Sequence, residues 1–538
     1  MKTITNSRKL ARLHPLCLTI ATAAIITIGI LPVTGRAASG TWLLNPINGD
    51  WNTGSNWSSG TPPNGPFDTA TFGVSNQTEV SLSASVGIFE VAFSNGANNY
   101  SIKCSPGIFL SLGSGVRNES GTLQSFVATV DNAGNHGLFA INESSSLGEL
   151  TAFTNEGAIV SGAAGGDLQF IDSPHAGSAT LVNEGGAVGG ASGGTIEFFN
   201  SASADNATIT NQAGEVAGAL GGMTQFWFVS RAATSTITSE GGSVTDAAGG
   251  VTLFRDNSSA GNATLIANGG SNGGGGGSIQ FQGKAGGATA RIEVFGNGNL
   301  DLTLHNPGII TIGSLEGDGQ VLLGSHSLSI GANNLSTVFS GVIQDNGGLT
   351  KTGSGTLTLS GANVYTGGTS VTSGALKVAN RTGSATGTGT VSVNAGTLGG
   401  RGIIAGPTTI GTGSGAGAFL EPSVGARQPA TTTIQSLLTF KADGSYTYKL
   451  NTKKARADEV VANGVTIESG AQFNFSAIGN KRLPLGSVFV ALSNTSASPI
   501  SGAFANLADG YTLSAGKNKY QASYTGGDGN ELTLTVVP

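Results

Sequence analysis

The sequence predicts an all-β protein, a right-handed parallel β-helix (β-solenoid) with coils of ~28 residues. Two observations support this fold class. Between positions 161 and 300, a Gly-Gly pair leads repeatedly into a short run that ends in phenylalanine, and this near-constant period is typical of units that stack on their own copies. Within each run apolar and polar residues alternate, a period of two that indicates strands. The phenylalanines are Phe170, Phe198, Phe226, Phe254 and Phe281.

A second series of apolar residues follows the phenylalanines at a constant offset: Leu181, Ile209, Ile237, Leu265 and Ile292. Because each coil of a β-helix adds ~4.8 Å along the axis, equivalent side chains lie above one another. We therefore expect two buried columns, and a stack of Asn183 and Asn211 at a turn. Glycine accounts for 88 of 538 residues, which we attribute to tight turns at positive φ.

Residues 1–38 have the features of a secretory signal peptide. A basic start precedes the apolar residues 16–33, and a small-x-small pattern predicts cleavage near Ala37 or Ala38. The alternative is an uncleaved membrane anchor, which Pro32 and the small residues after it disfavour. After cleavage, no later segment is long enough to span a membrane as a helix.

The charge balance argues against nucleic acid as a partner. Beyond residue 38 the chain has 20 basic and 31 acidic residues, a net charge of −11. Residues 38–425 carry −14 and residues 426–538 carry +3. Nucleic-acid binding relies on basic surfaces, whereas an acidic solenoid is explained by the solubility of a long exposed surface.

Residues 39–100 are predicted to form an N-terminal cap and the first coils. Three of the four tryptophans, Trp42, Trp51 and Trp57, fall here. The open end of a solenoid exposes its core and unpaired strand edges, which bulky aromatic residues can cover. The alternative is a platform on which sugar rings stack. We favour the cap and expect the rings to be buried.

The solenoid is predicted to continue through residues 101–300, which hold the regular repeats, and residues 301–425. Within the second part, the segment 342–379 resembles the autotransporter-associated β-strand repeat of bacterial passenger domains. The residues that match, after Leu349 and Lys351, are Gly355, Leu357, Leu359, Gly361, Asn363, Tyr365, Gly367, Gly368, Thr369, Gly374 and Leu376.

This resemblance implies a β-helical passenger, exported and surface-associated or released, in which the repeat supports folding or export. We expect Leu357 and Leu359 to point inward, the glycines and Asn363 to form corners, and Tyr365 to lie over a turn. In residues 426–538 aromatic residues and lysines return, and we predict a compact C-terminal β domain that caps the solenoid. We recognise no translocator barrel, which departs from the pattern of that family.

The sequence contains few of the residue clusters that catalysis on a β-helix requires. Polysaccharide lyases and hydrolases on β-helices need clustered carboxylates on one outward face. The histidines beyond the signal occupy unlike contexts at no shared phase: His136, His175, His305 and His326. One repeat position is often acidic, but we interpret it as a polar turn residue and not as a cation site: Glu156, Glu184, Gln212, Glu240 and Asn268. We predict no catalytic residues, metal or cofactor.

The sequence therefore favours an exported, non-enzymatic surface or extracellular protein of adhesin or envelope type. Its expected location is outside the cell or on the cell surface, associated with an outer membrane. Its expected partners are surface glycans or a host or neighbouring cell surface. Two alternatives remain: a polysaccharide lyase or hydrolase on a β-helix, and a carbohydrate-binding protein that uses the N-terminal tryptophans.

Overall fold

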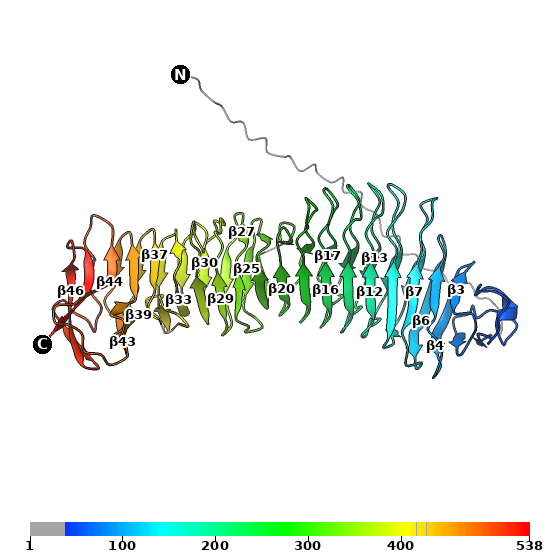
Figure 1. Cartoon of the computed structure of the whole chain (residues 1–538), viewed down its shortest axis with the longest axis horizontal. Coiled ribbons are helices and arrows are strands. Elements are labelled where there is room, and N and C mark those ends of the chain that lie inside the picture. Colours follow the sequence, from blue (N-terminus) through cyan, green and yellow to red (C-terminus); the bar gives the residue numbers. More distant parts are fainter. Residues whose placement is uncertain (1–37, 307, 416, 427) are drawn as a thin grey trace, which may run out of the picture. The chain divides into compact units, whose positions relative to one another are not determined.

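The computed structural model describes residues 38–306, 308–415, 417–426 and 428–538. The predicted signal peptide therefore lies, apart from Ala38, outside the described residues. The described chain consists of strands, turns and one short 3₁₀ helix, η1 (Gly54–Asn56), without an α-helix. No helix in this part of the chain is long and apolar enough to cross a membrane. The strands build successive coils along one axis (Figure 1), and the predicted parallel β-helix is confirmed.

Sheet 1 is a 14-stranded sheet that runs from the N-terminal cap to residue 344. Its strands pair in parallel, each with the equivalent strand of the next coil. They are β1 (Gly40–Thr41), β2 (Thr69–Phe72), β4 (Val86–Phe93), β6 (Phe109–Asn118), β8 (Leu138–Ile141), β11 (Asp167–Phe170), β13 (Thr195–Phe198), β15 (Met223–Phe226), β17 (Val251–Phe254), β19 (Ser278–Phe281), β21 (Asn299–Asp301), β24 (Gln320–Leu322) and β27 (Val342–Gln344), with β9 (Ser146–Leu147) on β6.

Sheet 2 is the most continuous sheet and extends nearly the whole length of the solenoid. All its pairs are parallel except that of β40 with β39. Its strands are β3 (Glu79–Leu82), β5 (Ser101–Cys104), β7 (Gln124–Ala128), β10 (Thr151–Asn155), β12 (Thr180–Asn183), β14 (Thr208–Asn211), β16 (Thr236–Ser239), β18 (Thr264–Ala267), β20 (Arg291–Val294), β23 (Ser314–Gly317), β26 (Thr337–Phe339), β29 (Thr356–Leu359), β31 (Ala375–Val378), β33 (Gly396–Gly400), β36 (Ala418–Leu420), β39 (Gly444–Asn451), β40 (Arg456–Ala457) and β43 (Gln472–Ile478).

The third side of the solenoid changes character along the chain. In the first half it is a row of single parallel bridges, from His175 through Ser203 and Arg231 to Ser259 and Gly286. From residue 309 onward it becomes sheet 3, an eight-stranded parallel sheet. Its strands are β22 (Ile309–Ile312), β25 (Ser327–Ile330), β28 (Leu349–Lys351), β30 (Thr369–Val371), β32 (Val391–Val393), β35 (Thr408–Ile410), β38 (Leu438–Phe440) and β42 (Val465–Ile467).

The repeat period of the first half does not hold throughout the solenoid. On sheet 3, Leu328, Leu349, Thr369 and Val391 occupy one registered position in successive coils. Their numbering shows a step of about 20 residues, at the short end of solenoid repeats. These coils are shorter because they lack the long loops that join sheet 2 to sheet 1 in the first half. The predicted coil length therefore describes the first half only.

The predicted boundary at residue 426 does not interrupt the coils. β38, β39 and β42 pair in parallel with the coils before them. The end is sheet 4, in which three parallel pairs give way to antiparallel pairs of the last strands. Its order is β34 (Ile403–Ile404), β37 (Thr431–Ile434), β41 (Glu459–Ala462), β44 (Val488–Asn494), β47 (Glu531–Val537), β46 (Asn518–Gly526) and β45 (Thr512–Ala515).

The five repeated phenylalanines form one buried stack. Each ring lies 4.5, 4.7, 4.7 or 4.9 Å from the next, at interplanar angles of 4–9°. All five side chains are completely buried. The second series is also buried and in register on sheet 2: Leu181, Ile209, Ile237, Leu265 and Ile292. The parallel register of the strands thus stacks each side chain on its copy in the next coil.

A column of buried asparagines stabilises the corner after sheet 2. The side-chain amide of Asn155 donates to Asn183 at 2.8 Å, and that of Asn183 donates to Asn211 at 2.9 Å. Each amide also donates to a backbone carbonyl 40 residues further on, at 2.8–3.0 Å. Because these amide nitrogens are buried, the ladder gives hydrogen-bond partners to groups that would otherwise be costly to bury.

Many glycines serve close backbone packing and not positive φ. The loops between sheet 2 and sheet 1 stack on one another, and the amide of Gly190 donates to Gly218 at 2.8 Å. Gly190 and Gly218, at the tips of these loops, have positive φ, whereas Gly193 does not. A Cβ on Gly193 would lie 2.5 Å from the backbone nitrogen of Gly222 in the next coil. Tight turns therefore explain only part of the glycine content, and close packing between coils explains another part.

Replacing Phe226 with Ala should lower the free energy of unfolding of the surrounding coils by ~3–5 kcal/mol, because it leaves a cavity in the stack. Denaturant unfolding monitored with amide hydrogen exchange measures this loss. Phe228→Ala is the matched control, since Phe228 is 43% exposed and should change little. Equal effects of the two substitutions would contradict the stack.

Gly193→Ala should destabilise the protein by about 1–3 kcal/mol, because its methyl group meets backbone atoms that cannot move aside easily. Gly87→Ala serves as the control, since a Cβ there meets nothing within 4 Å. That change should be neutral or slightly stabilising. Thermal unfolding of both variants tests the explanation, which fails if Gly193→Ala is tolerated as well as Gly87→Ala.

Candidate functional surface

The three N-terminal tryptophans are buried and form the cap. Trp42, Trp51 and Trp57 are 2%, 0% and 2% exposed. Their rings pack on Phe72 at 5.9, 5.6 and 5.5 Å, and each indole N–H donates to a backbone carbonyl. Rings in this arrangement cover the first coil and offer no open face to a sugar. The alternative of a tryptophan sugar platform is therefore excluded at this site.

The fourth tryptophan was not singled out from the sequence. Trp227 lies between Phe199 of the preceding coil, at 6.2 Å between ring centres, and Arg255 of the next coil. The guanidinium carbon of Arg255 is 4.4 Å from the indole centre. The coils above and below therefore occupy both faces of the ring, and it too provides no stacking platform.

The residues of the passenger-like repeat form strands and corners of two short coils. Leu357, Leu359 and Leu376 are buried on β29 and β31. Gly368 and Gly374 have positive φ, whereas a Cβ on Gly355, Gly361 or Gly367 would lie within 2.6 Å of the preceding coil. The first group forms turns, and the second permits close stacking.

Asn363 and Tyr365 are both buried corner residues. The amide oxygen of Asn363 accepts from the backbone of Ile343 at 2.8 Å, and its nitrogen donates to Ala385 at 2.6 Å. Tyr365 is completely buried, with its hydroxyl 2.6 Å from that of Thr369. Burial raises the pKa of the Tyr365 phenol. Tyr365 therefore fills the core, in contrast to the expected position over a turn.

Lys351 is a buried cation in an otherwise apolar column. It occupies the inward position of β28, in register with Ile330 and Val371, and is 1% exposed. Its ammonium group donates to the backbone carbonyls of Thr352, Gly353 and Ser373. Burial lowers the pKa of Lys351 to about 8. The side chain thus satisfies corner carbonyls at the cost of a desolvated charge.

An unbroken row of hydroxyl side chains follows the outward position of sheet 3. Every one of its eight strands contributes a serine or threonine in register. The flanking residues on each strand point inward; Ile310 and Ile312, for example, are buried. The row consists of Thr311, Ser329, Thr350, Ser370, Ser392, Thr409, Thr439 and Thr466. We call this set the hydroxyl row.

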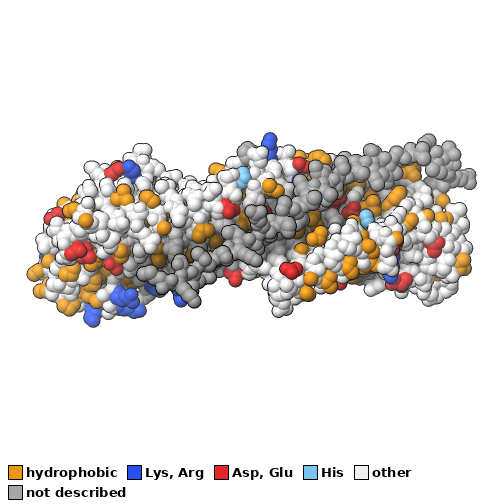
Figure 2. All heavy atoms as spheres, turned by 90° about the horizontal axis from the view of Figure 1, so that it is seen from above, with side chains coloured by type: hydrophobic (Ala, Val, Ile, Leu, Met, Phe, Trp, Pro, Cys, Tyr) orange, Lys and Arg blue, Asp and Glu red, His pale blue; other side chains and the backbone are white. Residues whose placement is uncertain are grey.

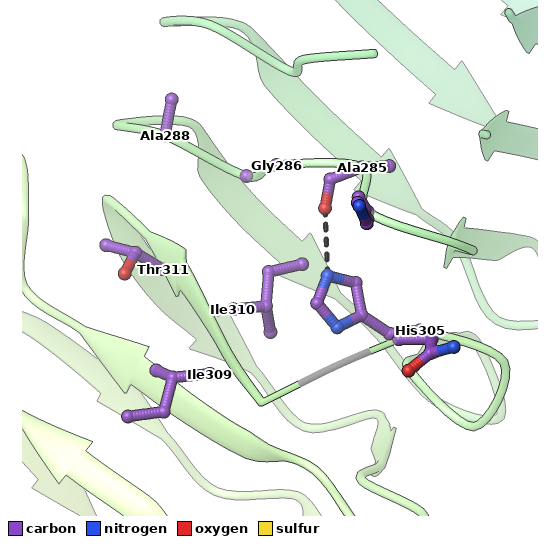
Figure 3. A pocket seen from close by; sticks show the side chains of 10 residues that line it. Ala285, Gly286, Ala288, His305, Ile309, Ile310 and Thr311 are labelled. Carbon is purple, nitrogen blue, oxygen red and sulfur yellow. Dashed lines mark hydrogen bonds between the residues drawn. The ribbon is translucent and has the colours of Figure 1, made fainter. Parts of the chain in front are cut away.

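Two hollows lie on the hydroxyl row. The first has a volume of about 310 Å³ and lies between residues 284–288 and the start of β22, beside His305 (Figure 3). The second, of about 280 Å³, lies over Thr350, Ser370 and Ser392. Ser329, which is 6% exposed, separates them. Among the described residues that line one hollow or the other, Lys284 is the one cation and none is a carboxylate.

Asp167 and Glu197 belong to a hydrogen-bonded ladder on sheet 1 and not to a cluster in a hollow. The amide nitrogen of Gln169 lies 2.7 Å from Asp167 and 3.3 Å from Glu197, and Gln225 donates to Glu197 at 3.3 Å. Burial raises the pKa of Asp167, with a further contribution from Glu197, and burial also raises the pKa of Glu197. Neither hollow includes these residues.

The other polar residues considered from the sequence do not assemble into a metal or catalytic centre. In the repeated turn position, Asn268 donates to Glu240 at 2.8 Å and Glu156 accepts from the backbone of Val130 at 3.0 Å. The described residues contain no group of three or more His, Cys, Asp or Glu that could hold a metal ion. Uncharged surface predominates on the face shown in Figure 2.

Comparison with known proteins agrees with the repeat found above. Residues 349–378 match the model of the passenger-associated transport repeat, so the passenger-like character of this segment is confirmed. No curated protein matches the chain. Among solved structures, the Haemophilus influenzae Hap adhesin is similar, with 11% identity and a TM-score of 0.31 over 87% of this chain. The match covers 59% of the Hap chain.

The lowered pKa of Lys351 predicts a pH-dependent stability. The unfolded chain holds this proton up to about pH 10.5, whereas the native state releases it near pH 8. Since the unfolded state then binds more protons, the free energy of unfolding should rise between these values, by up to about 1.4 kcal/mol per pH unit. Denaturant unfolding from pH 7.5 to 10 measures the rise. Lys351→Met should remove this contribution, and an identical slope in that variant would contradict the assignment.

Proposed function

We propose that the protein is an exported, adhesin-type β-helix that acts by surface contact and not by catalysis. The observation that supports the proposal is the hydroxyl row of sheet 3. Two of its members, Thr350 and Ser370, lie within the transport-repeat segment. Hydroxyl groups both donate and accept hydrogen bonds, so a long uncharged row of them suits contact with another polar surface. The signal-like residues 1–38 support export and cleavage near Ala37 or Ala38.

The strongest residues for the enzymatic alternative are Asp167 and Glu197. Both carboxylates approach the same Gln169 amide, a proximity that hydrolysis of a glycosidic bond would require. Both carboxylates are partly buried and hydrogen-bonded to glutamine side chains of the same sheet face. This arrangement favours a structural ladder, and the contact function remains the better account.

The purified chain from residue 38, coupled to beads, should cause the beads to adhere to cell surfaces, whereas albumin-coated beads should not. Incubation of the same protein with soluble and insoluble polysaccharides should release no sugar ends. Adhesion is measured by counting retained beads, and release by a reducing-end assay. Sugar release that disappears in Glu197→Gln would overturn the non-enzymatic proposal. Failure of the beads to adhere would overturn the contact function.

A further inference from the structure

The first hollow exists because the third side of the solenoid widens there. Up to Gly286 this side makes one bridge per coil, but β22 in the next coil is a four-residue strand. Among the described residues, no backbone hydrogen bond joins Ile309–Ile312 to residues 285–288. Pairing resumes only at Gly313, whose amide donates to Ala290 at 2.9 Å. The mismatch leaves an open space against the edge of β22.

His305 lines this hollow as a buried ring, and one of its two nitrogens has no partner among the described residues. Its Nε2 lies 3.1 Å from the carbonyl oxygen of Ala285 (Figure 3). A carbonyl can only accept, so Nε2 carries the proton and Nδ1 presents a lone pair. The side chain is 6% exposed and Nδ1 is unpaired. Burial lowers the pKa of His305, which favours the neutral ring.

The remaining lining of the first hollow combines apolar and uncharged polar groups. Ile309 and Ile310 form an aliphatic wall, and Asn306 and Thr311 provide an amide and a hydroxyl. Thr311 is also the first member of the hydroxyl row, which continues to the second hollow over Thr350, Ser370 and Ser392. In the second hollow the amide of Asn394 donates to the Ser370 hydroxyl at 3.3 Å.

From this combination we infer that the outer face of sheet 3 binds an uncharged glycan, with one sugar residue beside His305 and others over Thr350, Ser370 and Ser392. Sugar hydroxyls can hydrogen-bond to the Asn306 amide and the Thr311 hydroxyl, and the C–H face of a sugar ring suits the isoleucine wall. The volume of about 310 Å³ lies at the small end of ligand sites. This inference rests on the proposed contact function and names its partner.

The charge of the solenoid selects against acidic glycans. Residues 38–425 carry a net charge of −14, which repels polyanions over the length of the coils. Among the described residues that line the first hollow, Lys284 alone is a cation, so the repulsion comes from the coils around the hollow and not from its lining. An uncharged polysaccharide avoids this repulsion and can hydrogen-bond to the accessible hydroxyl and amide groups of the two hollows.

The test is depletion of the purified chain from residue 38 by insoluble cellulose, chitin and xylan, with polygalacturonate beads as the acidic comparison. We expect at least one neutral polysaccharide to deplete the protein and polygalacturonate to leave it in solution. Thr311→Val and the triple variant Thr350→Val/Ser370→Ala/Ser392→Ala should each weaken binding about tenfold, since each loses hydrogen bonds to the ligand.

The matched control is Thr180→Val/Thr208→Val/Thr236→Val, which removes an equivalent outward row of hydroxyls from sheet 2. Its affinity should equal that of the unmodified chain. No depletion by any neutral polysaccharide, stronger depletion by polygalacturonate, or an equal loss in the control would overturn the inference. If beads still adhere to cells in that event, only the glycan assignment fails and the contact function survives.

Discussion

Every level of this structure depends on the parallel register between adjacent coils, which places each residue ~4.8 Å above its copy. Backbone hydrogen bonds fix that spacing, so a side chain at one position must be compatible with the equivalent residue of the coil before and the coil after. Phenylalanine rings at 4.5–4.9 Å and the Asn155–Asn183–Asn211 ladder are two solutions to this constraint, one apolar and one polar. Glycine at Gly193 is a third, used where backbone lies directly on backbone.

The same register determines the chemistry of the outer faces. A polar residue repeated outward becomes a row, and on sheet 3 the row consists of hydroxyl groups over its eight strands. Where the third side changes from single bridges to β22, the first hollow appears. Lys351 lies in regular register in an apolar column, at a corner whose carbonyls need a donor. The hydroxyl row and the first hollow thus both follow from the way coils stack, and the functional proposals rest on these two features.

The repeat period was sufficient to predict the β-helix, because a fixed step plus alternation defines both the coil and its inward positions. What the period could not reveal depends on contacts between coils. Gly193 and the positive-φ glycines look alike in sequence, because their roles differ only in whether the backbone of the next coil lies against them. Tyr365 is expected over a turn because its neighbours are turn formers, and only the stacked coils show that it fills the core. The hollow beside His305 arises where the single bridge at Gly286 is followed by the four-residue strand β22, a mismatch between coils that the residues around His305 do not signal. The hydroxyl row was detectable only after the shorter coils had been aligned.

The most direct test of the register is a distance measurement between spin labels on outward positions of sheet 2. Ser125 and Thr264 are joined by successive registered pairs through Ala152, Thr180, Thr208 and Thr236. Cysteines introduced at Ser125 and Thr264 and spin-labelled should therefore give a narrow double electron–electron resonance distance centred near ~24 Å, five coil spacings. A broad distribution, or a distance far from that value, would contradict the stacked β-helix on which the account rests.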